Sequence, residues 1–355
     1  MAFQLDKLLR PHILKLKPYS SARDEYSGKE GVFLDANENP FGSITAAAYN
    51  RYPDPYQRDL KVKIGLVKNI DSEQIFVGNG SDEAIDLLFR AFCQPGKDNV
   101  ILLPPTYGMY EVSAGINDVA TKKVNLSPDF QMDPNAVLSA VDAETKMIFI
   151  CSPNNPSGNK LERSAIRQVV EGFEGLVVID EAYIDFSDEP SFIEELNRYP
   201  NLVIMQTFSK AWGLAGLRLG LAFASPELIH ILNLIKPPYN INQLSQELVA
   251  EALQDVAKKE KMVKDILEER DYLLKALTKL PLVQKIYPSH ANFLLVKLPE
   301  PKAMYAYLIS KKVIVRDRSK VVHGEGCLRI SVGTRSENEL LLQAMAAFPN
   351  PIANK

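Results

Sequence analysis

The stretch GLVVIDEAY, residues 175–183, contains a run of consecutive apolar residues, Leu176–Ile179, that ends at an acid, Asp180. A short run that is apolar on successive positions is typical of a strand covered on both faces. Similar runs lie on either side of it, at Ile75–Val77, Val100–Leu103, Met147–Cys151, Leu202–Gln206 and Leu219–Phe223. Helical patterns separate these runs, and strands that alternate with helices predict an α/β domain with a mostly parallel sheet.

The helix with the clearest pattern is Asp82–Phe92, in which apolar residues recur at the spacing of one helix face. Ser81 can cap its start, and the pair Pro95-Gly96 ends it. Between Pro238 and Pro281 the chain has neither proline nor glycine, which predicts one or two long helices that lead away from the sheet.

The C-terminal part of the chain has a different pattern. Its charged cluster KKEK, residues 258–261, is most simply a solvated helix face. Beyond it, short apolar runs alternate with helical segments, which predicts a smaller α+β domain; the runs are Asn292–Val296, Val313–Val315 and Leu328–Val332. We therefore expect an N-terminal arm or part of the small domain at residues 1–38, a large domain at 39–245 and the small domain at 246–355.

Composition excludes several classes of protein. The 355 residues carry a net charge of −3 with no basic run, so nucleic acid and anionic membranes are poor candidates for partners. No stretch approaches the roughly 18 apolar residues that span a bilayer, and the start MAFQLDKLLRPH lacks the apolar core of a signal peptide. The scattered cysteines and histidines fit neither a disulfide framework nor a metal site. We expect a cytoplasmic protein without a metal that binds a small molecule.

The segment GNGSDEA, residues 78–84, lies between a predicted strand and the helix that follows it. Free backbone N–H groups and the helix dipole at such a position bind anions, most naturally a phosphate. The spacing Gly78-x-Gly80 also occurs in dinucleotide-binding folds, but Glu83 stands where that fingerprint needs a third glycine. A plain turn followed by a helix cap is the alternative.

Two ionisable residues have unusual surroundings. Lys210 lies among small and apolar residues in TFSKAWGLAGLRLG, residues 207–220. Desolvation there lowers the pKa of the lysine, so that its amine can form a Schiff base. The alternative is a lysine whose stem covers apolar surface while its charge stays in water. Asp180 follows a buried strand and should need a cationic partner, unless it serves as an N-cap or in a structural ion pair.

The segment CSPNNPSG, residues 151–158, follows another predicted strand. Asn154 or Asn155 can point an amide at a ligand there, although the segment alone is also simply a good turn. Pyridoxal phosphate requires a phosphate cradle, a buried acid for its pyridinium nitrogen, an amide and a tyrosine for its ring oxygen, and a lysine for its aldehyde. Because the sequence offers all of these, we expect Lys210 to hold this cofactor.

The sequence resembles the fold-type I pyridoxal-phosphate-dependent aminotransferases over nearly its whole length, from PYSSARDEY (18–26) and VFLDANENP (32–40) to LRISVGTRSE (328–337). The resemblance to the fold type rests on the motifs SPNNPSG, VIDEAY and SKAWGLAGLRLG. A resemblance to its histidinol-phosphate branch rests on PYSSAR, RYPDP (51–55) and VRDRS (315–319). It implies a large domain with a mostly parallel seven-stranded sheet sandwiched by helices, plus a smaller α+β domain.

The resemblance also implies catalytic roles. Lys210 would form the Schiff base and move the proton between the substrate carbon and the cofactor. Asp180 would keep the pyridine nitrogen protonated. Tyr183 and Asn155 would bind the phenolic oxygen of the ring, on which Tyr107 would stack.

The remaining implied roles concern the anionic groups and a second subunit. The cofactor phosphate would lie in a cradle made by Gly80, Ser81, Asp82, Ser209 and Arg218. In this family Tyr52 reaches the phosphate of the neighbouring subunit, which implies a homodimer. The anionic end of the substrate would be held by Tyr19, Arg316 and Arg329.

The implied reaction is a ping-pong transamination that interconverts L-histidinol phosphate and 2-oxoglutarate with imidazole-acetol phosphate and L-glutamate. Guanidinium forks at Arg316 and Arg329 can bind a phosphate or a carboxylate bidentately, unless Arg316 forms a surface ion pair with Asp317. An aromatic or broad-specificity aminotransferase and a threonine-phosphate decarboxylase are the alternatives within the fold type. A cofactor-sensing regulator would need a DNA-binding module, which the sequence lacks, and a nicotinamide dehydrogenase leaves Lys210 unexplained.

Overall fold

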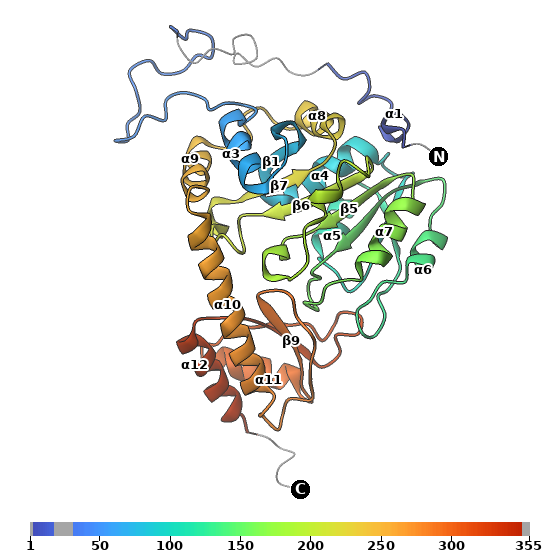
Figure 1. Cartoon of the computed structure of the whole chain (residues 1–355), viewed down its shortest axis with the longest axis vertical. Coiled ribbons are helices and arrows are strands. Elements are labelled where there is room, and N and C mark those ends of the chain that lie inside the picture. Colours follow the sequence, from blue (N-terminus) through green and yellow to red (C-terminus); the bar gives the residue numbers. More distant parts are fainter. Residues whose placement is uncertain (1–2, 18–30, 350–355) are drawn as a thin grey trace.

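A computed structural model of the chain describes residues 3–17 and 31–349. Its larger part is built on a seven-stranded sheet with the strand order β1-β7-β6-β5-β4-β2-β3 (Figure 1). The strands are β1 Ile75–Asn79, β2 Asn99–Leu102, β3 Ala120–Lys123, β4 Thr145–Cys151, β5 Leu176–Asp180, β6 Leu202–Thr207 and β7 Leu219–Phe223. All run parallel except β7, which is antiparallel to both of its neighbours. The predicted mostly parallel seven-stranded sheet is confirmed.

Strand β5 shows why these runs form a central sheet. Every residue of β5 is buried, and successive side chains enter opposite cores. Val177 and Ile179 pack in one apolar cluster, whereas Leu176 and Val178 pack in the other. The period of two along a strand sends alternate side chains to opposite faces of the sheet. Because both sets of side chains are apolar, helices cover both faces. The helices of this larger part are α1 Leu5–Leu8, α3 Arg58–Lys68, α4 Gly80–Phe92, α5 Met109–Ile116, α6 Pro134–Ser139, α7 Arg163–Gly172, α8 Pro226–Ile235 and α9 Gln243–Ala252.

Two local predictions in this part need correction. Helix α4 begins at Gly80 with Asn79 as its N-cap, so Ser81 lies in the first turn and does not cap the helix. Strand β3, with the sequence ATKK, escaped prediction because it is an edge strand whose side chains are exposed or half-buried. Such a strand has only one neighbour to pair with and therefore needs no continuous apolar run.

The smaller part contains a four-stranded antiparallel sheet in the order β10-β11-β9-β8, with β8 Lys285–Ile286, β9 Phe293–Lys297, β10 Arg316–Asp317 and β11 Cys327–Ser331. Helices α11 Pro301–Ser310 and α12 Arg335–Ala346 pack with this sheet, and the long helix α10 Val256–Leu277 runs from α9 to α12 (Figure 1). The apolar run Val313–Val315 does not form a strand, since the strand begins at Arg316. The domain boundaries at residues 38/39 and 245/246 stay predictions.

Helix α10 also corrects the interpretation of the cluster KKEK as wholly solvated. The Lys259 side chain is only 14% exposed, and its Nζ atom lies 3.0 Å from a carboxylate oxygen of Asp185. The same ammonium lies 5.6 Å from the centroid of the Trp212 ring. Lys259 therefore joins α10 to the segments that follow β5 and β6, because Asp185 and Trp212 come shortly after those strands.

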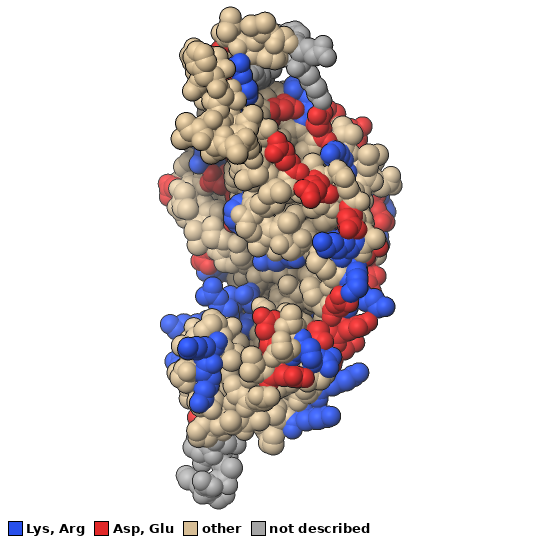
Figure 2. All heavy atoms as spheres, turned by 90° about the vertical axis from the view of Figure 1, so that its left-hand side faces the viewer, with Lys and Arg blue, Asp and Glu red and all other residues tan. Residues whose placement is uncertain are grey.

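The surface of the molecule carries mixed charge. Figure 2 shows acidic and basic side chains interspersed over one face. No helix in residues 3–17 and 31–349 has the length and apolar composition needed to cross a membrane. The mixture of charges gives no indication of a large electrostatic field of one sign on the face that Figure 2 shows.

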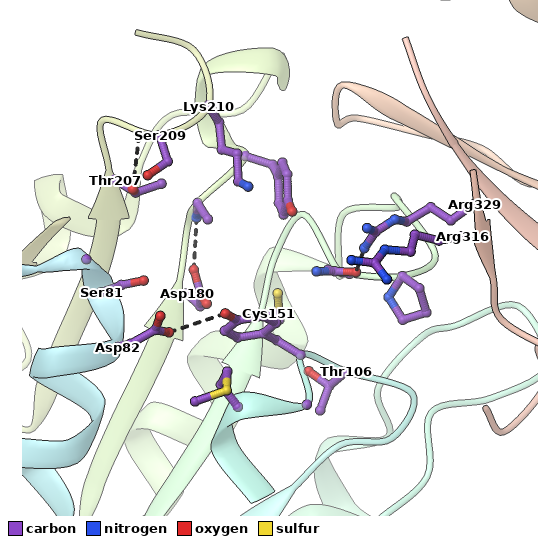
Figure 3. A pocket seen from close by; sticks show the side chains of 18 of the residues that line it. Ser81, Asp82, Thr106, Cys151, Asp180, Thr207, Ser209, Lys210, Arg316 and Arg329 are labelled. Carbon is purple, nitrogen blue, oxygen red and sulfur yellow. Dashed lines mark hydrogen bonds between the residues drawn. The ribbon is translucent and has the colours of Figure 1, made fainter. Parts of the chain in front are cut away.

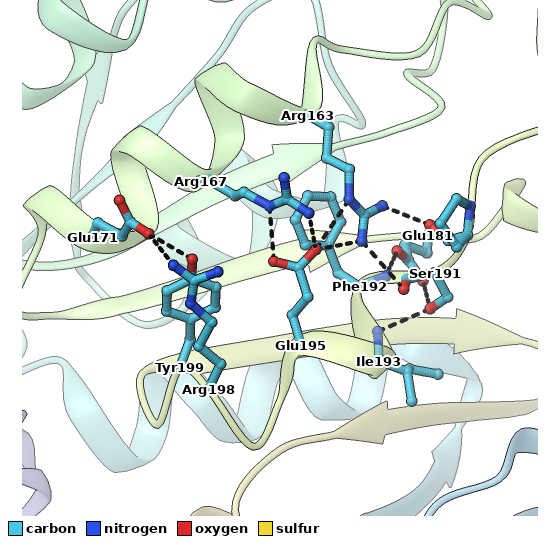
Figure 4. Close-up of polar contacts among 11 residues, drawn as sticks. Arg163, Arg167, Glu171, Glu181, Ser191, Phe192, Ile193, Glu195, Arg198 and Tyr199 are labelled. Atoms are coloured by element: carbon cyan, nitrogen blue, oxygen red, sulfur yellow. Dashed lines mark hydrogen bonds and ion pairs between the residues drawn. The ribbon is translucent and has the colours of Figure 1, made fainter.

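A network of charged groups fixes the segment that follows β5 (Figure 4). The Glu195 carboxylate forms ion pairs with Arg163 at 2.5 Å and with Arg167 at 2.9 Å, and both arginines belong to helix α7. The Arg163 guanidinium also lies 3.8 Å above the Phe192 ring. Buried Glu181, which directly follows Asp180, accepts a hydrogen bond of 2.7 Å from the Phe192 backbone N–H. The network thus ties the chain beyond Asp180 to helix α7.

Replacing Glu195 tests this network. Glu195→Gln leaves two neighbouring guanidinium groups without their shared carboxylate, so we expect the free energy of unfolding to fall by about 1–3 kcal/mol. Glu171→Gln is the matched control, because the Glu171–Arg198 pair is more than half exposed on both sides and should contribute clearly less. Urea denaturation of both variants measures the two losses. Equal losses would show that the network is no stronger than a surface ion pair.

Candidate active site

A cavity of about 570 Å³ lies where the strands of the large sheet end, closed on one side by the small sheet (Figure 3). Parallel strands bring their carboxyl ends to one edge of a sheet, and β7 brings its amino end to the same edge because it runs the opposite way. Most of the predicted site residues line this cavity: Gly80, Ser81, Asp82, Tyr107, Asn155, Asp180, Tyr183, Ser209, Lys210, Arg218, Arg316 and Arg329.

Two predicted residues do not lie there. Tyr52 stacks on Tyr239 with ring centroids 4.5 Å apart and lines a second cavity of about 510 Å³. Its predicted role in a neighbouring subunit is not tested by a single chain and stays a prediction. Tyr19 lies outside the described residues.

The phosphate cradle was predicted at the start of α4. Gly80 has a φ of +71°, and its N–H donates a hydrogen bond of 2.8 Å to the Arg218 carbonyl oxygen. A Cβ atom on Gly220 of β7 would lie 2.2 Å from the Ser81 backbone nitrogen, so only glycine allows β7 to approach the helix start this closely. The Arg218 guanidinium lies 3.8 Å from the Asp82 carboxylate. Backbone N–H groups, a helix dipole and an arginine therefore converge on one anion site.

Asp180 is 3% exposed at the end of β5. Its carboxylate accepts hydrogen bonds from the Tyr110 hydroxyl at 2.6 Å and from the Ala182 backbone N–H at 3.0 Å. Burial raises the pKa of Asp180, and these two hydrogen bonds together with the charge of Lys210 act in the opposite direction. Within residues 3–17 and 31–349 no cation forms an ion pair with it, so the expected cationic partner is not supplied by direct contact with a side chain.

Lys210 follows β6, the strand next to β5, and its ammonium lies 5.7 Å from the Tyr183 ring centroid. Burial lowers the pKa of Lys210 most, and the charges of Arg329 and Arg218 lower it further, against opposing contributions from Asp180 and Asp82. The direction agrees with the desolvation expected from the sequence. Lys210 can therefore lose its proton at a pH closer to neutrality than a lysine on the surface can.

The residues predicted to bind the cofactor ring line the same cavity as Asp180 and Lys210. Burial raises the pKa of Tyr183, so its hydroxyl is neutral and available as a donor at neutral pH. Asn155 accepts a hydrogen bond from Arg329 through its amide oxygen, which orients its NH₂ group as a donor. Tyr107, whose hydroxyl donates to Asp82 at 3.2 Å, packs edge-on against Tyr110. Donors for a ring oxygen and an aromatic face thus lie in the same cavity.

Three lining or supporting residues escaped the sequence analysis. Tyr110 holds the Asp180 carboxylate, and its place three residues after Tyr107, in the first turn of α5, was the available signal. Arg318 lines the cavity together with Arg316 and Arg329, and it directly follows the end of β10. Thr106 lines it too and has a buried hydroxyl without a hydrogen-bond partner within the described part of the chain.

This set of groups fits pyridoxal phosphate. A helix start and an arginine match its phosphate, a buried carboxylate without a cation matches its ring nitrogen, and a desolvated amine matches its aldehyde. Across residues 3–17 and 31–349, no group of three or more His, Cys, Asp or Glu side chains is placed to hold a metal ion.

Comparisons with known proteins address the family directly. The family model described as aminotransferase class I and II matches residues 33–345. The chain belongs to this family. It is 57% identical to a histidinol-phosphate aminotransferase of Cytophaga hutchinsonii, over 98% of this chain and all of that protein. It is 55% identical to one of Parabacteroides distasonis, over 96% of this chain and 98% of that protein.

A solved structure shares the fold of this aminotransferase. The histidinol-phosphate aminotransferase from Sinorhizobium meliloti in complex with pyridoxal-5′-phosphate matches with a TM-score of 0.79, over 95% of this chain and 96% of that one. The two sequences are 22% identical, so this likeness concerns the fold alone. The predicted fold type and enzyme family are confirmed.

The close approach of β7 to α4 gives a test of the phosphate cradle. In Gly220→Ala the added methyl group overlaps the backbone of Gly80 and Ser81, so the helix start must move. We expect the free energy of unfolding to fall by about 1–3 kcal/mol and the affinity for pyridoxal phosphate to fall with it. Fluorescence titration of the cofactor-free protein with pyridoxal phosphate measures the affinity.

Gly216→Ala is the control for this variant. A Cβ atom at Gly216 meets nothing within 4 Å, and its φ is not positive. This substitution should leave both stability and cofactor affinity unchanged. A Gly220→Ala protein that binds the cofactor as tightly as the Gly216→Ala protein would contradict the assignment of the cradle.

Proposed function

We propose that this aminotransferase uses pyridoxal phosphate to interconvert L-histidinol phosphate and 2-oxoglutarate with imidazole-acetol phosphate and L-glutamate. The relatives of more than half identical sequence over nearly the whole chain support this substrate assignment. The observation that carries the chemistry is the pair Asp180 and Lys210, because both are desolvated on neighbouring strand ends and both border one cavity.

Each side chain has a definite task in this proposal. Bound pyridoxal phosphate supplies an electron sink for the carbanion that forms when an amine substrate loses its α-proton. Lys210 would attach the cofactor covalently through its amine and then carry the proton between the substrate α-carbon and the cofactor. The lowered pKa of Lys210 keeps a free amine available for that transfer.

Asp180 would keep the ring nitrogen of bound pyridoxal phosphate protonated. Its carboxylate is oriented by the Tyr110 hydroxyl and the Ala182 N–H, which leaves its charge to be balanced by a protonated nitrogen. Tyr183 and Asn155 would donate hydrogen bonds to the ring oxygen, and Tyr107 would supply an aromatic surface for the ring. Arg316 and Arg329 bind the anionic end of either substrate as bidentate forks, at the side of the cavity formed by the small sheet (Figure 3).

We also propose that the active unit is a homodimer. The segment between residues 31 and 50 exposes large apolar side chains almost completely, namely Val32, Leu34, Phe41 and Ile44. Contiguous exposed apolar groups of this kind mark an interaction surface. Tyr52 lies close to this segment in sequence and does not line the active-site cavity of its own chain, so it would then complete the phosphate site of the second subunit.

The substrate assignment is tested by the absorbance spectrum of the purified, cofactor-loaded protein. Addition of L-histidinol phosphate should rapidly discharge the band of the lysine-bound cofactor, whereas L-phenylalanine and threonine phosphate should change it slowly. Lys210→Ala should show neither the band nor turnover, because no other amine is assigned to the cofactor. A Lys210→Ala protein that still cycles would contradict the role of Lys210. Discharge by another amine alone would leave the cofactor chemistry intact and remove the substrate assignment.

A further inference from the structure

The wall of the cavity that the small sheet provides carries three arginines. Arg316 and Arg329 lie directly opposite each other in the β10–β11 ladder. Arg318 continues the same register, since its backbone N–H donates to the Cys327 carbonyl oxygen at 2.9 Å. Residues two apart on an extended strand point to the same side, so Arg316 and Arg318 share a face and both line the cavity. Asp317 points elsewhere and accepts a hydrogen bond from the Ser319 N–H at 2.8 Å.

Within the described part of the chain, none of the three guanidinium groups forms an ion pair. Among residues 3–17 and 31–349, no carboxylate lies within ion-pair distance of any of them, and the partner of Arg329 is the neutral amide of Asn155. Burial lowers the pKa of Arg329, and the charges of Arg318 and Arg316 lower it further. Burial and the charge of Arg316 lower the pKa of Arg318 in the same way. The cluster is therefore a concentration of positive charge that an anionic ligand would relieve.

Arg318 has a further distinguishing feature. Its Nε atom is buried and has no hydrogen-bond partner within the described part of the chain. A buried donor without an acceptor is costly, so a shift of the Arg318 side chain that gives this donor an acceptor on a bound anion is favourable. Two forks, Arg316 and Arg329, already suffice for a carboxylate, which has only two oxygens. A third guanidinium finds acceptors only on a group with more oxygens and more charge.

We propose that Arg318 determines specificity for a phosphate monoester, by binding a phosphate oxygen that a carboxylate lacks. This inference rests on the proposed function and extends it from the pair Arg316 and Arg329 to a third side chain. The dianionic phosphate of L-histidinol phosphate offers three terminal oxygens, so each guanidinium can receive one acceptor. Glutamate, which must use the same cavity in the other half of the reaction, leaves Arg318 without an acceptor.

The test compares a substrate with and without its phosphate. In Arg318→Gln, the ratio of kcat/KM for L-histidinol phosphate to kcat/KM for L-histidinol should fall about tenfold to a hundredfold. This fall is the size expected for the loss of one charge-assisted hydrogen bond. It should arise mainly from a higher KM for L-histidinol phosphate. The half-reaction with L-glutamate should stay within about threefold of the wild type, because its carboxylates do not use Arg318. Lys320→Gln is the control: it removes one charge from an exposed position on the same segment and should leave the ratio unchanged.

A second measurement does not depend on which phosphate amine is the substrate. Inorganic phosphate should inhibit the glutamate half-reaction of the cofactor-loaded enzyme competitively, and Arg318→Gln should weaken this inhibition by about tenfold or more. Inhibition should also weaken as the pH falls and the phosphate dianion takes up a proton, and it should weaken less steeply in the variant. If wild-type enzyme ignores L-histidinol phosphate while Arg318→Gln still weakens phosphate inhibition, the substrate assignment fails and the role of Arg318 stands.

Two outcomes would overturn the inference. One is an Arg318→Gln enzyme with the wild-type phosphate preference and the wild-type inhibition by phosphate. The other is an equal loss of activity towards L-histidinol phosphate, L-histidinol and L-glutamate, which would assign Arg318 to the structure of the segment. Arg318→Lys separates charge from shape, because it keeps the charge and loses the planar fork, and should recover only part of the preference.

Discussion

The burial of the Asp180 carboxylate is the constraint on which the site depends. A charge without water needs hydrogen bonds and an opposite charge. The Tyr110 hydroxyl and the Ala182 N–H supply the hydrogen bonds, whereas no side chain in residues 3–17 and 31–349 forms an ion pair with Asp180. The position is fixed because β5 is a central strand with both faces covered. Nearby Lys210 is itself partly desolvated and partly repelled by arginines. A ligand with a cationic ring nitrogen and an aldehyde satisfies both residues at once.

The topology of the large sheet brings the other groups to this pair. Parallel strands deliver Asn155, Asp180 and Lys210 to one edge, and the reversed strand β7 delivers Arg218 to the same edge. Close packing of β7 against the start of α4 then depends on Gly220, where a side chain would displace the backbone of Ser81. The small sheet closes the cavity with arginines. The site is therefore shared between elements that lie far apart in the sequence.

The sequence predicted the parts of this arrangement that local pattern determines. Six strands of the large sheet were predicted because buried strands are apolar on successive residues, whereas the exposed edge strand β3 carries no such signal. The motif residues followed from the family resemblance. Tyr110, Arg318 and the contact of Lys259 with Asp185 could not be predicted, since each depends on packing or register between distant segments. Ser81 was wrongly expected to cap α4, because the helix begins at Gly80, before the predicted start at Asp82.

The protonation state of the cofactor's ring nitrogen tests the central claim most directly. Nitrogen-15 NMR of the enzyme loaded with ring-labelled pyridoxal phosphate should show a protonated nitrogen near neutral pH, because buried Asp180 needs a positive partner. In Asp180→Asn the nitrogen should lose its proton while the cofactor stays bound through the phosphate cradle and Lys210. A neutral ring nitrogen in the wild type, or the same protonated signal in both proteins, would contradict the account.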